Sequence, residues 1–360
     1  MDVIDVVVIG AGQAGLSSAY FLRRSGLGFV VLDHNEGPGG AWRHRWPSLT
    51  LGRAHRVHDL PGMPLGEPDT TRPSAEVVAE YFGAYEREFG LDVRRPVHVH
   101  RVAEGGGGRL RVESDAGTWE ARGLINATGT WDRPFWPYYP GRETFRGRQL
   151  HTAGYRSKEE FAGEHVVVVG GGASAVQLLL EIAEVATTTW VTRREPVFRE
   201  GPFDESAGRA SVALVEDRVR RGLPPASVVS VTGLALTPEV RAGIEAGILR
   251  RLPMFDRVTP YGVAWADGRE IAADAILWAT GFRPALDHLA PLGLRAPGGG
   301  IRVEGTRVVD DPRVHLVGYG PSASTIGANR AGRAAVRELR ALLAPVRSAP
   351  APARGVSALA

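Results

Sequence analysis

The sequence predicts an α/β protein with two doubly wound parallel sheets, each carrying a small antiparallel β element. Three observations lead to this prediction. A β-branched run over Val3–Ile9 ends in a glycine, as expected of a parallel strand buried on both faces. The same order of apolar strand, glycine turn and helix returns from Val166–Val169 onward. Each copy also closes with an apolar strand that ends in Ala-Thr-Gly, at 127–129 and at 279–281, so a supersecondary unit is repeated.

The first copy has the pattern of a βαβ unit. Apolar side chains with helical spacing run from Leu16 to Arg23, and Phe29–Leu32 has the composition of a second buried strand. A hairpin turn at Asp115-Ala116-Gly117 then leads into the closing strand. The order of these elements predicts a parallel sheet with an antiparallel addition.

The second copy repeats this order. Helical spacing runs from Ser174 to Glu184, a strand is predicted at Thr188–Thr192, and the hairpin turn is Asp267-Gly268. The segment from Glu195 to Pro260 carries no clear pattern, and we expect it to shape access of the substrate.

A passage rich in proline and aromatic residues, Trp131–Gly141, is predicted to be the crossing between the domains because prolines prevent regular structure there. We expect a first domain from residues 1–155 and 286–345, with a strand at Val314–Val317 and a final helix at Ser324–Leu343. Residues 156–285 form the inserted domain, and the Pro/Ala/Ser-rich residues 346–360 are predicted to be a disordered tail.

Composition narrows the class of protein. The chain has 360 residues, of which 43% are hydrophobic, and this is enough for two cores. The net charge is only +3 and no run of five like charges occurs, so we expect small-molecule partners and no nucleic acid. The absence of cysteine excludes disulfides, thiolate metal sites and cysteine-based redox chemistry. No apolar run approaches the roughly 18–20 residues of a membrane span, so we expect a cytoplasmic protein, with a homodimer left open.

The first glycine turn is Gly10-Ala11-Gly12-Gln13-Ala14-Gly15, placed between a strand and a helix. Glycines at these positions allow a tight turn, a close approach of backbone to a pyrophosphate and close contact between strand and helix. Asp33 follows at the end of the second strand, where a carboxylate can accept hydrogen bonds from ribose hydroxyls. Strand, turn, helix and acid together predict a Rossmann-like dinucleotide-binding domain.

The second glycine turn, Gly170-Gly171-Gly172-Ala173-Ser174-Ala175, has alanine in the third position of the motif, a common variant. The position equivalent to Asp33 holds Arg193, followed by Arg194. A guanidinium pair can bind a 2′-phosphate, so this domain is predicted to prefer NADPH to NADH. The alternative is that both arginines are solvated surface residues of an arginine-rich chain.

Two further motifs accompany the turns. The segment Gly39-Gly40-Ala41-Trp42 fits the pattern GG-x-W, and residues 145–155, from Phe145 to Tyr155, fit F-x-G-x-x-x-H-x-x-x-Y at every fixed position. With the two Ala-Thr-Gly strand ends, they make the chain resemble the flavin-containing monooxygenases, class B flavoproteins, and especially compact bacterial members. The resemblance runs from Val3 to about Leu343.

This resemblance implies FAD in the first domain and NADPH in the second. NADPH would reduce the flavin, O₂ would add as a C4a-hydroperoxide, and a small soft nucleophile, a sulfide or an amine, would be oxygenated. Baeyer–Villiger relatives carry tryptophan at the position of Tyr155, so the resemblance favours oxygenation of sulfur or nitrogen over ketone oxygenation. Ketone oxygenation stays an alternative, as do an uncoupled NADPH oxidase and a non-catalytic FAD- and NADPH-binding protein. The absence of cysteine excludes the mechanism of the pyridine nucleotide–disulfide reductases.

The resemblance also assigns cofactor contacts. Those expected for FAD are Gly10, Gly12, Gln13, Ala14, Gly15, Asp33, His34, Gly40, Ala41, Trp42, Leu49, Val99, Ala127, Thr128, Gly129, Gly318, Ile326 and Gly327. Those expected for NADPH are Tyr155, Gly170, Gly172, Ala173, Ser174, Ala175, Gln177, Arg193, Arg194, Ala279, Thr280 and Gly281.

Catalytic side chains are harder to assign, because most of the chemistry would belong to the flavin. His151 is a candidate base, although a linker histidine is more often a hydrogen-bonded strut. Larger relatives place an asparagine near the flavin, and the comparable segment here, 49–55, has none. Arg53 or His55 is a candidate substitute. His98 and His100 lack an evident third ligand, so no metal site is expected.

Overall fold

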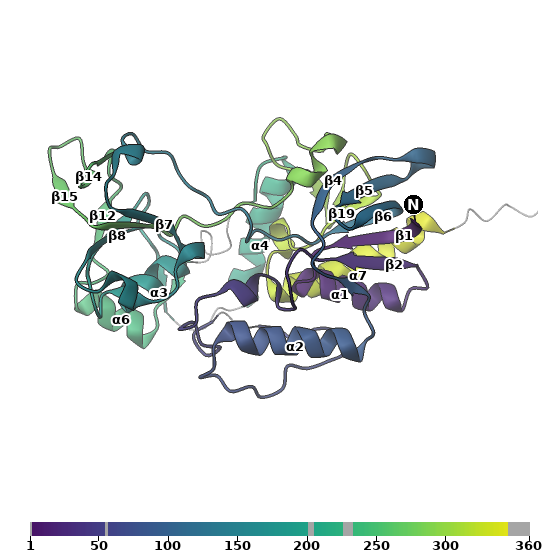
Figure 1. Cartoon of the computed structure of the whole chain (residues 1–360), viewed down its shortest axis with the longest axis horizontal. Helices are drawn as coiled ribbons and strands as arrows, with labels where there is room; N and C mark the ends of the chain where they lie inside the picture. The colour runs from purple at the N-terminus through teal and green to yellow at the C-terminus, as the bar shows by residue number, and fades with distance from the viewer. Residues whose placement is uncertain (1, 55–56, 201–204, 226–232, 345–360) are drawn as a thin grey trace, which may run out of the picture.

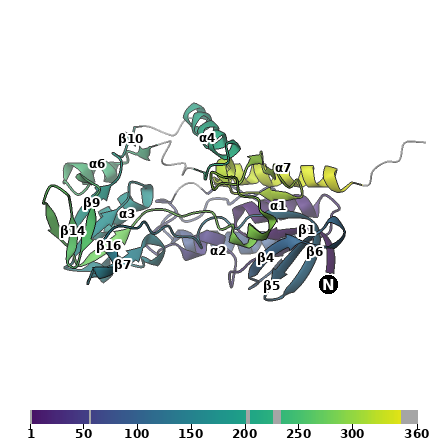
Figure 2. The ribbon, with the colours of Figure 1, turned by 90° about the horizontal axis from the view of Figure 1, so that it is seen from above.

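The computed structural model describes residues 2–54, 57–200, 205–225 and 233–344. Figures 1 and 2 show two lobes joined by extended segments, with α1 and α7 in one lobe and α3 and α6 in the other. Each lobe is built around its own parallel sheet.

The sheet of the first lobe has the strand order β17-β18-β19-β6-β1-β2-β3, and β5 also pairs with β6 and β4. β1 pairs in parallel with β2 and β6, and β19 pairs in parallel with β6. The strands are β1 (Asp2–Ile9), β2 (Phe29–Leu32), β3 (Val93–Arg94), β4 (Val99–Glu104), β5 (Leu110–Ser114), β6 (Gly117–Asn126), β17 (Val303–Glu304), β18 (Arg307–Val308) and β19 (Val314–Leu316).

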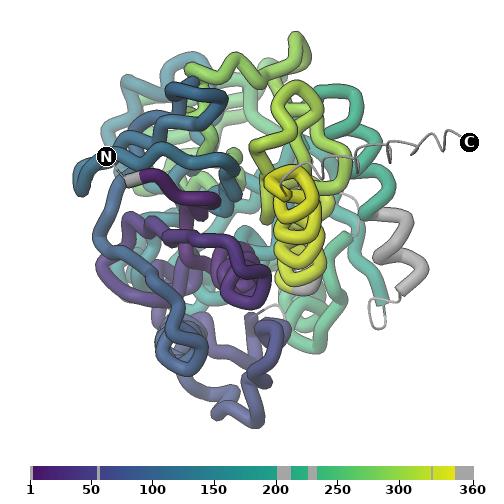
Figure 3. Tube along the Cα trace, turned by 90° about the vertical axis from the view of Figure 1, so that its right-hand side faces the viewer, coloured from purple at the N-terminus to yellow at the C-terminus, as the bar shows by residue number. Residues whose placement is uncertain are grey.

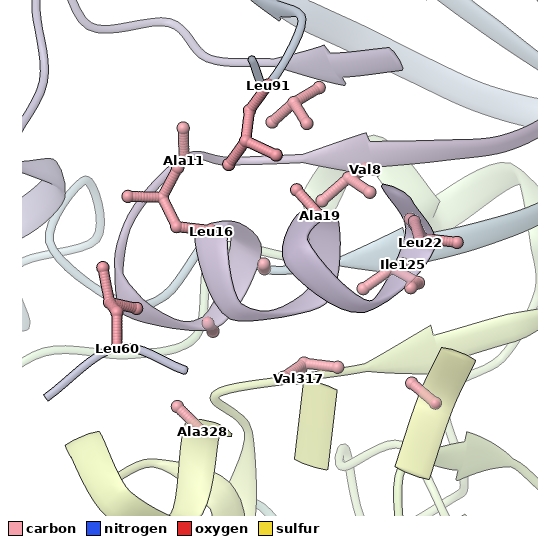
Figure 4. Packing of buried hydrophobic residues seen from close by; sticks show 14 of the residues in the cluster. Val8, Ala11, Leu16, Ala19, Leu22, Leu60, Leu91, Ile125, Val317 and Ala328 are labelled. Carbon is pink, nitrogen blue, oxygen red and sulfur yellow. The ribbon is translucent and has the colours of Figure 1, made fainter. Parts of the chain in front are cut away.

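Helices α1 (Gln13–Arg23), α2 (Ser74–Glu88) and α7 (Thr325–Leu343) cover one face of this sheet, and α1 and α7 lie side by side (Figure 3). Figure 4 shows Leu16, Ala19 and Leu22 of α1 packed near Val8 and Ile125 of the sheet. The opposite face is covered by β4, β5 and the segment from Leu286 to Val308. The first and last parts of the chain therefore share one core.

The sheet of the second lobe is wholly parallel and has the order β12-β9-β8-β16-β7. Its strands are β7 (Arg148–His151), β8 (His165–Val169), β9 (Thr187–Thr192), β12 (Arg251–Pro253) and β16 (Ala275–Trp278). Helices α3 (Ala173–Ile182) and α6 (Pro238–Glu245) pack on one face, and a three-stranded antiparallel sheet covers the other: β13 (Arg257–Thr259), β14 (Gly262–Ala264) and β15 (Glu270–Ala272).

The remaining elements are short or connect the lobes. β10 (Phe198–Arg199) pairs with β11 (Leu234–Ala235), and α4 (Glu205–Arg220) lies between them in sequence. The 3₁₀ turns are η1 (Gly40–His44), η2 (Gly106–Gly108), η3 (Arg142–Thr144), η4 (Thr152–Gly154), η5 (Lys158–Phe161), η6 (Asp287–Leu292) and η7 (Gly320–Ser322).

The predicted fold class is confirmed: two α/β units with parallel sheets, each extended by an antiparallel element. The domain limits stay a prediction, and two elements make contacts across them. β7 pairs with β16 at the edge of the second sheet, so this sheet begins at Arg148, before the predicted boundary at residue 155. α4 belongs to the inserted segment, yet its Val219 is buried in the first core. The predicted tail at 346–360 lies outside the described residues.

Candidate cofactor site

A cavity of about 640 Å³ lies at the carboxyl ends of the strands of the first sheet, where ligands bind in open α/β sheets. Its wall is formed by the β1–α1 turn, the end of β2, η1, the start of β4, the loop after β6 and the region before α7. The expected FAD contacts that line it are Gly10, Gly12, Gln13, Ala14, Asp33, His34, Gly40, Ala41, Trp42, Val99, Ala127, Thr128, Gly129 and Gly318.

Close packing requires glycine at position 10 of the first turn and at position 40 opposite it. Gly10 has φ +96°, and a Cβ atom there would lie 2.6 Å from the carbonyl oxygen of Ala127. A Cβ atom on Gly40 would lie 2.7 Å from the Cα atom of Gly12. α1 begins after Gly12 with no capping side chain and no acidic residue in its first turn. Its N–H groups therefore remain available to a phosphate, so the residues present fit a dinucleotide.

Asp33 lines the cavity, and hydrogen bonds from Arg95 and Asn35 fix its side chain. Its side chain accepts a hydrogen bond from Arg95 Nε at 2.9 Å and one from Asn35 Nδ2 at 3.0 Å, and only 1% of the residue is exposed. Arg95 also donates two bonds of 2.7 Å to Glu86 of α2. A carboxylate can accept about four hydrogen bonds, so capacity remains for ribose hydroxyls.

Histidines gather on the same wall, and sequence reasoning anticipated only His34 as a contact. The hydrogen bond from His34 to Asp132, 3.2 Å away, raises the pKa of His34. His288 lies 2.6 Å from Asn126 Oδ1, and burial lowers its pKa to about 4. His98 and His100 also line the cavity, with ring centroids 4.8 Å apart. In the described ranges no cluster of His, Cys, Asp or Glu is arranged to hold a metal ion.

The hydrogen-bonding groups of the Gln13 side chain are only partly satisfied by other described residues. Its Nε2 donates to Asn329 Oδ1 at 3.0 Å and to the His58 carbonyl at 3.2 Å. Its Oε1 is buried and has no partner within the described part of the chain. A buried acceptor without a donor is costly, and a bound ligand or water at the cavity would relieve that cost.

The second glycine turn repeats the geometry of the first. Gly170 has φ +141°, and a Cβ atom there would lie 2.2 Å from the carbonyl oxygen of Ala279, just as Gly10 lies against Ala127. α3 begins after Gly172 without a capping side chain. Arg193 and Arg194 follow β9 directly and are exposed, and neither guanidinium forms an ion pair with another described residue.

The two Ala-Thr-Gly strand ends meet at the junction of the lobes. Trp131, just after the first strand end, stacks on Phe282, just after the second, with ring centroids 5.0 Å apart. The backbone N–H of Phe135 donates to the carbonyl oxygen of Gly281 at 2.9 Å. Thr280 Oγ1 donates to the carbonyl oxygen of Phe135. The carboxyl ends of both sheets therefore face a common region.

Three of the expected contact residues pack against, or hydrogen-bond to, other parts of the protein. Leu49 packs in the core of the second lobe and is not part of the cavity wall, because its loop lies against α3. Gln177 donates from Nε2 to the carbonyl oxygen of Arg53 at 3.0 Å. Tyr155 is 1% exposed, and its hydroxyl donates to Glu181 Oε1 at 2.8 Å, so its side chain faces the protein interior.

Both ring nitrogens of His151 have hydrogen-bond partners in the protein. Its Nδ1 accepts from the N–H of Ala153 at 3.1 Å, and its Nε2 lies 3.0 Å from the carbonyl oxygen of Gly281, to which it donates. Burial lowers the pKa of His151, so the neutral form is favoured. Both ring nitrogens are used, which supports the strut interpretation over the catalytic base.

The other expected residues are placed as follows. Arg53 is exposed and its backbone serves the contact with Gln177. His55 lies outside the described residues. Gly15 packs against the carbonyl oxygen of Gly10 and is absent from the cavity wall. The N–H of Gly327 donates a hydrogen bond to Oγ of Ser324, the N-cap residue of α7, and Ile326 lies in the same helical turn.

The fold and the two glycine turns define a flavoprotein oxidoreductase with two dinucleotide-binding domains. The model of the pyridine nucleotide-disulphide oxidoreductase family matches residues 7–207. The chain belongs to this family and is a flavin-dependent, NADPH-consuming monooxygenase whose cofactors are FAD and NADPH. Since the sequence has no cysteine, a route through a cysteine pair is not open to it.

Three similar proteins support this assignment. The structure of a flavin-containing monooxygenase from Stenotrophomonas maltophilia is 42% identical, with a TM-score of 0.83, over 96% of this chain and 100% of that one. Indole-3-pyruvate monooxygenase YUCCA1 of Oryza sativa subsp. japonica is 30% identical over 77% of this chain and 76% of the relative. A Baeyer-Villiger monooxygenase of Streptomyces coelicolor is 28% identical over 78% of this chain and 64% of the relative. Within the described ranges, no helix has the length and apolarity to cross a bilayer.

Proposed function

We propose that this monooxygenase oxygenates a small soft nucleophile, a sulfide or an amine, with FAD held in the first lobe and NADPH in the second. The observation that carries the proposal is the meeting of the two Ala-Thr-Gly strand ends through Trp131 and Phe282. This contact brings the carboxyl ends of two dinucleotide folds together, as hydride transfer between two cofactors requires. Tyr155, where the ketone-oxygenating relatives have tryptophan, favours heteroatom oxygenation.

The first lobe supplies the binding groups for FAD. The uncapped N-terminus of α1 would hold the pyrophosphate, and Asp33 would accept bonds from the ribose. Val99 and the neighbouring histidines would enclose the adenine end of the cavity. When bound, the flavin supplies the redox chemistry with NADPH and O₂.

The second lobe would bind NADPH in the same manner. The uncapped N-terminus of α3 would hold the pyrophosphate, and the backbone of Ala279 packs against Gly170 of the turn. Arg193 and Arg194 would bind the 2′-phosphate, since both are exposed and free of ion pairs with described residues. Excluding water from the junction is the function we assign to the aromatic residues around Trp131.

The test is turnover of the purified FAD-loaded protein with NADPH and O₂ in the presence of thioanisole, trimethylamine or cyclohexanone. We expect NADPH consumption with formation of the sulfoxide or the N-oxide. Hydrogen peroxide as the only product would support an uncoupled oxidase, and a lactone as the only oxygenated product would support Baeyer–Villiger activity. Protein that stays yellow without consuming NADPH would support a binding protein. Each of these three results would overturn the proposal.

A further inference from the structure

The loop that follows the GG-x-W segment is docked onto the second lobe. Trp46 and Leu49 precede α2 of the first lobe in sequence, yet both are buried in the core of the second lobe with residues of α3. Gln177 of α3 donates to the carbonyl oxygen of Arg53 in the same loop at 3.0 Å. We call residues 46–54 the docking loop. It connects the wall of the FAD cavity to the helix that begins at the second glycine turn.

Glu181 makes the second polar attachment of the docking loop. Its Oε1 accepts a hydrogen bond from Ser48 Oγ at 2.6 Å and another from Tyr155 Oη at 2.8 Å. Ser48 belongs to the docking loop, and Tyr155 is the last fixed residue of the F-x-G-x-x-x-H-x-x-x-Y signature. One carboxylate oxygen therefore joins the first lobe, the linker and α3.

Local helix chemistry disfavours a carboxylate at this position. Glu181 lies in the last turn of α3, where the helix dipole favours cations. It is partly buried and has no described Lys, Arg or His within ion-pair distance; Lys158, whose charge acts on it at longer range, pairs with Glu184 instead. A partly buried charge without a cation is retained at a cost unless hydrogen bonds compensate. Here the compensation comes from two hydroxyl donors that belong to other parts of the chain.

Both donors remain available under ordinary conditions. Burial, together with the nearby Glu181 carboxylate, raises the pKa of Tyr155, so its hydroxyl stays protonated and donates. The Tyr155 ring is held between Phe161 and Trp46, at centroid distances of 5.9 and 6.1 Å. The position of the hydroxyl is therefore set by packing on both sides of the junction.

We propose that Glu181 is a positioning residue for the monooxygenase reaction, which holds α3, and with it the second glycine turn, in register with the docking loop at the flavin. It acts through Ser48 and Tyr155 and is not among the residues that line the FAD cavity. Loss of the attachment lets α3 move relative to the FAD cavity, so NADPH is bound less tightly and more reducing equivalents are lost as hydrogen peroxide. This proposal rests on the assignment of NADPH to the second lobe.

The experiment compares Glu181→Ala, the conservative Glu181→Gln, and Glu184→Ala as a matched control in the FAD-loaded protein. Glu184 lies two residues beyond α3 and pairs with Lys158, and it makes no hydrogen bond or ion pair with residues 46–54. Hydrogen–deuterium exchange of the peptide covering 46–54 reports the attachment itself, without NADPH. Steady-state kinetics then give KM for NADPH, kcat and the fraction of NADPH that yields peroxide.

We expect Glu181→Ala to raise exchange of 46–54 at least several-fold, to raise KM for NADPH about 3- to 10-fold and to increase the peroxide fraction. Glu181→Gln keeps an oxygen acceptor and should restore most of each property, while Glu184→Ala should change none of them. Unchanged exchange in Glu181→Ala would overturn the proposal directly. Raised exchange with KM and peroxide fraction unaltered would overturn the assigned positioning effect. Absence of NADPH consumption in the parent protein would refute the proposed function instead, and the exchange result would still stand.

Discussion

At Gly15 the first turn has no room for even one side-chain atom. A Cβ atom there would lie 1.8 Å from the carbonyl oxygen of Gly10, a backbone atom that cannot move without opening the turn. We expect Gly15→Ala to abolish or greatly reduce FAD retention, measured as flavin absorbance per protein after gel filtration. Gly106→Ala is the control, because a Cβ atom there meets nothing within 4 Å. Normal FAD content in Gly15→Ala would contradict the assignment of this turn.

Arg193 and Arg194 lead to a second residue-level prediction. Replacing both with alanine removes the groups proposed to bind the 2′-phosphate, so KM for NADPH should rise about 10- to 100-fold, ~1.4–2.8 kcal/mol. KM for NADH should remain nearly unchanged, because NADH has no 2′-phosphate. Arg340→Ala, an exposed arginine in the last turn of α7, serves as the control. Equal losses with both nucleotides would refute the phosphate site.

Sequence reasoning located residues whose position follows from the turn itself. Gly10, Asp33 and Ala127 were predicted at the cavity because a strand–turn–helix motif fixes where its backbone lies. The contacts that Leu49, Gln177 and Tyr155 make could not be predicted, because the direction of a side chain depends on the neighbouring lobe. The bonds from Arg95 to Asp33 and Glu86 join the segment after β2 to α2 and the segment after β3, and no local sequence pattern predicts them.

At the scale of elements, β19 contains a buried base that makes stability depend on pH. His315 is fully buried, its Nδ1 lies 2.8 Å from Thr306 Oγ1, and burial lowers its pKa to about 4. Between pH 6.5 and about 4 the unfolded chain therefore binds the extra proton and the folded chain does not. Stability should fall as pH falls through this window, by at most about 1.4 kcal/mol per pH unit from this residue.

The measurement is urea unfolding of the FAD-loaded protein at pH 4.5, 5.5 and 6.5. His315→Leu should be less stable at pH 6.5 but should lose less stability on acidification. Thr306→Val removes the same hydrogen bond and keeps the imidazole, so it should retain the parent's pH dependence. If His315→Leu and the parent lose stability equally on acidification, His315 does not contribute as described.

Elements with a clear local period were predicted well. The two βαβ units, both hairpin turns and the final helix α7 follow from apolar spacing and glycine positions. β7 and α4 were not predicted, for a different reason in each case. β7 has only four residues, and its position depends on pairing with β16, which is distant in sequence. α4 belongs to the inserted segment by sequence but packs against the first lobe.

At the scale of the whole molecule, the lobes are coupled because the core of each lobe contains residues from a segment that otherwise belongs to the other lobe. Trp46 and Leu49 of the first part are buried with α3, and Val219 of the inserted segment is buried with Tyr319. Stacking of Trp131 on Phe282 adds a contact at the junction. We therefore expect the parent protein to unfold in one transition, with loss of secondary structure and release of FAD at the same temperature.

Trp46→Ala should separate these two events. Trp46 is 3% exposed and packs edge-on against Tyr155, so its removal leaves a cavity in the second core and should cost about 3–5 kcal/mol there. The FAD cavity keeps its own core, so the second lobe should melt before flavin is released. Circular dichroism and flavin fluorescence, followed in the same thermal scan, detect the two events. Trp119→Ala weakens the core of the first lobe instead and should release FAD earlier. Coincident transitions in Trp46→Ala would show that the lobes are coupled through contacts other than the docking loop.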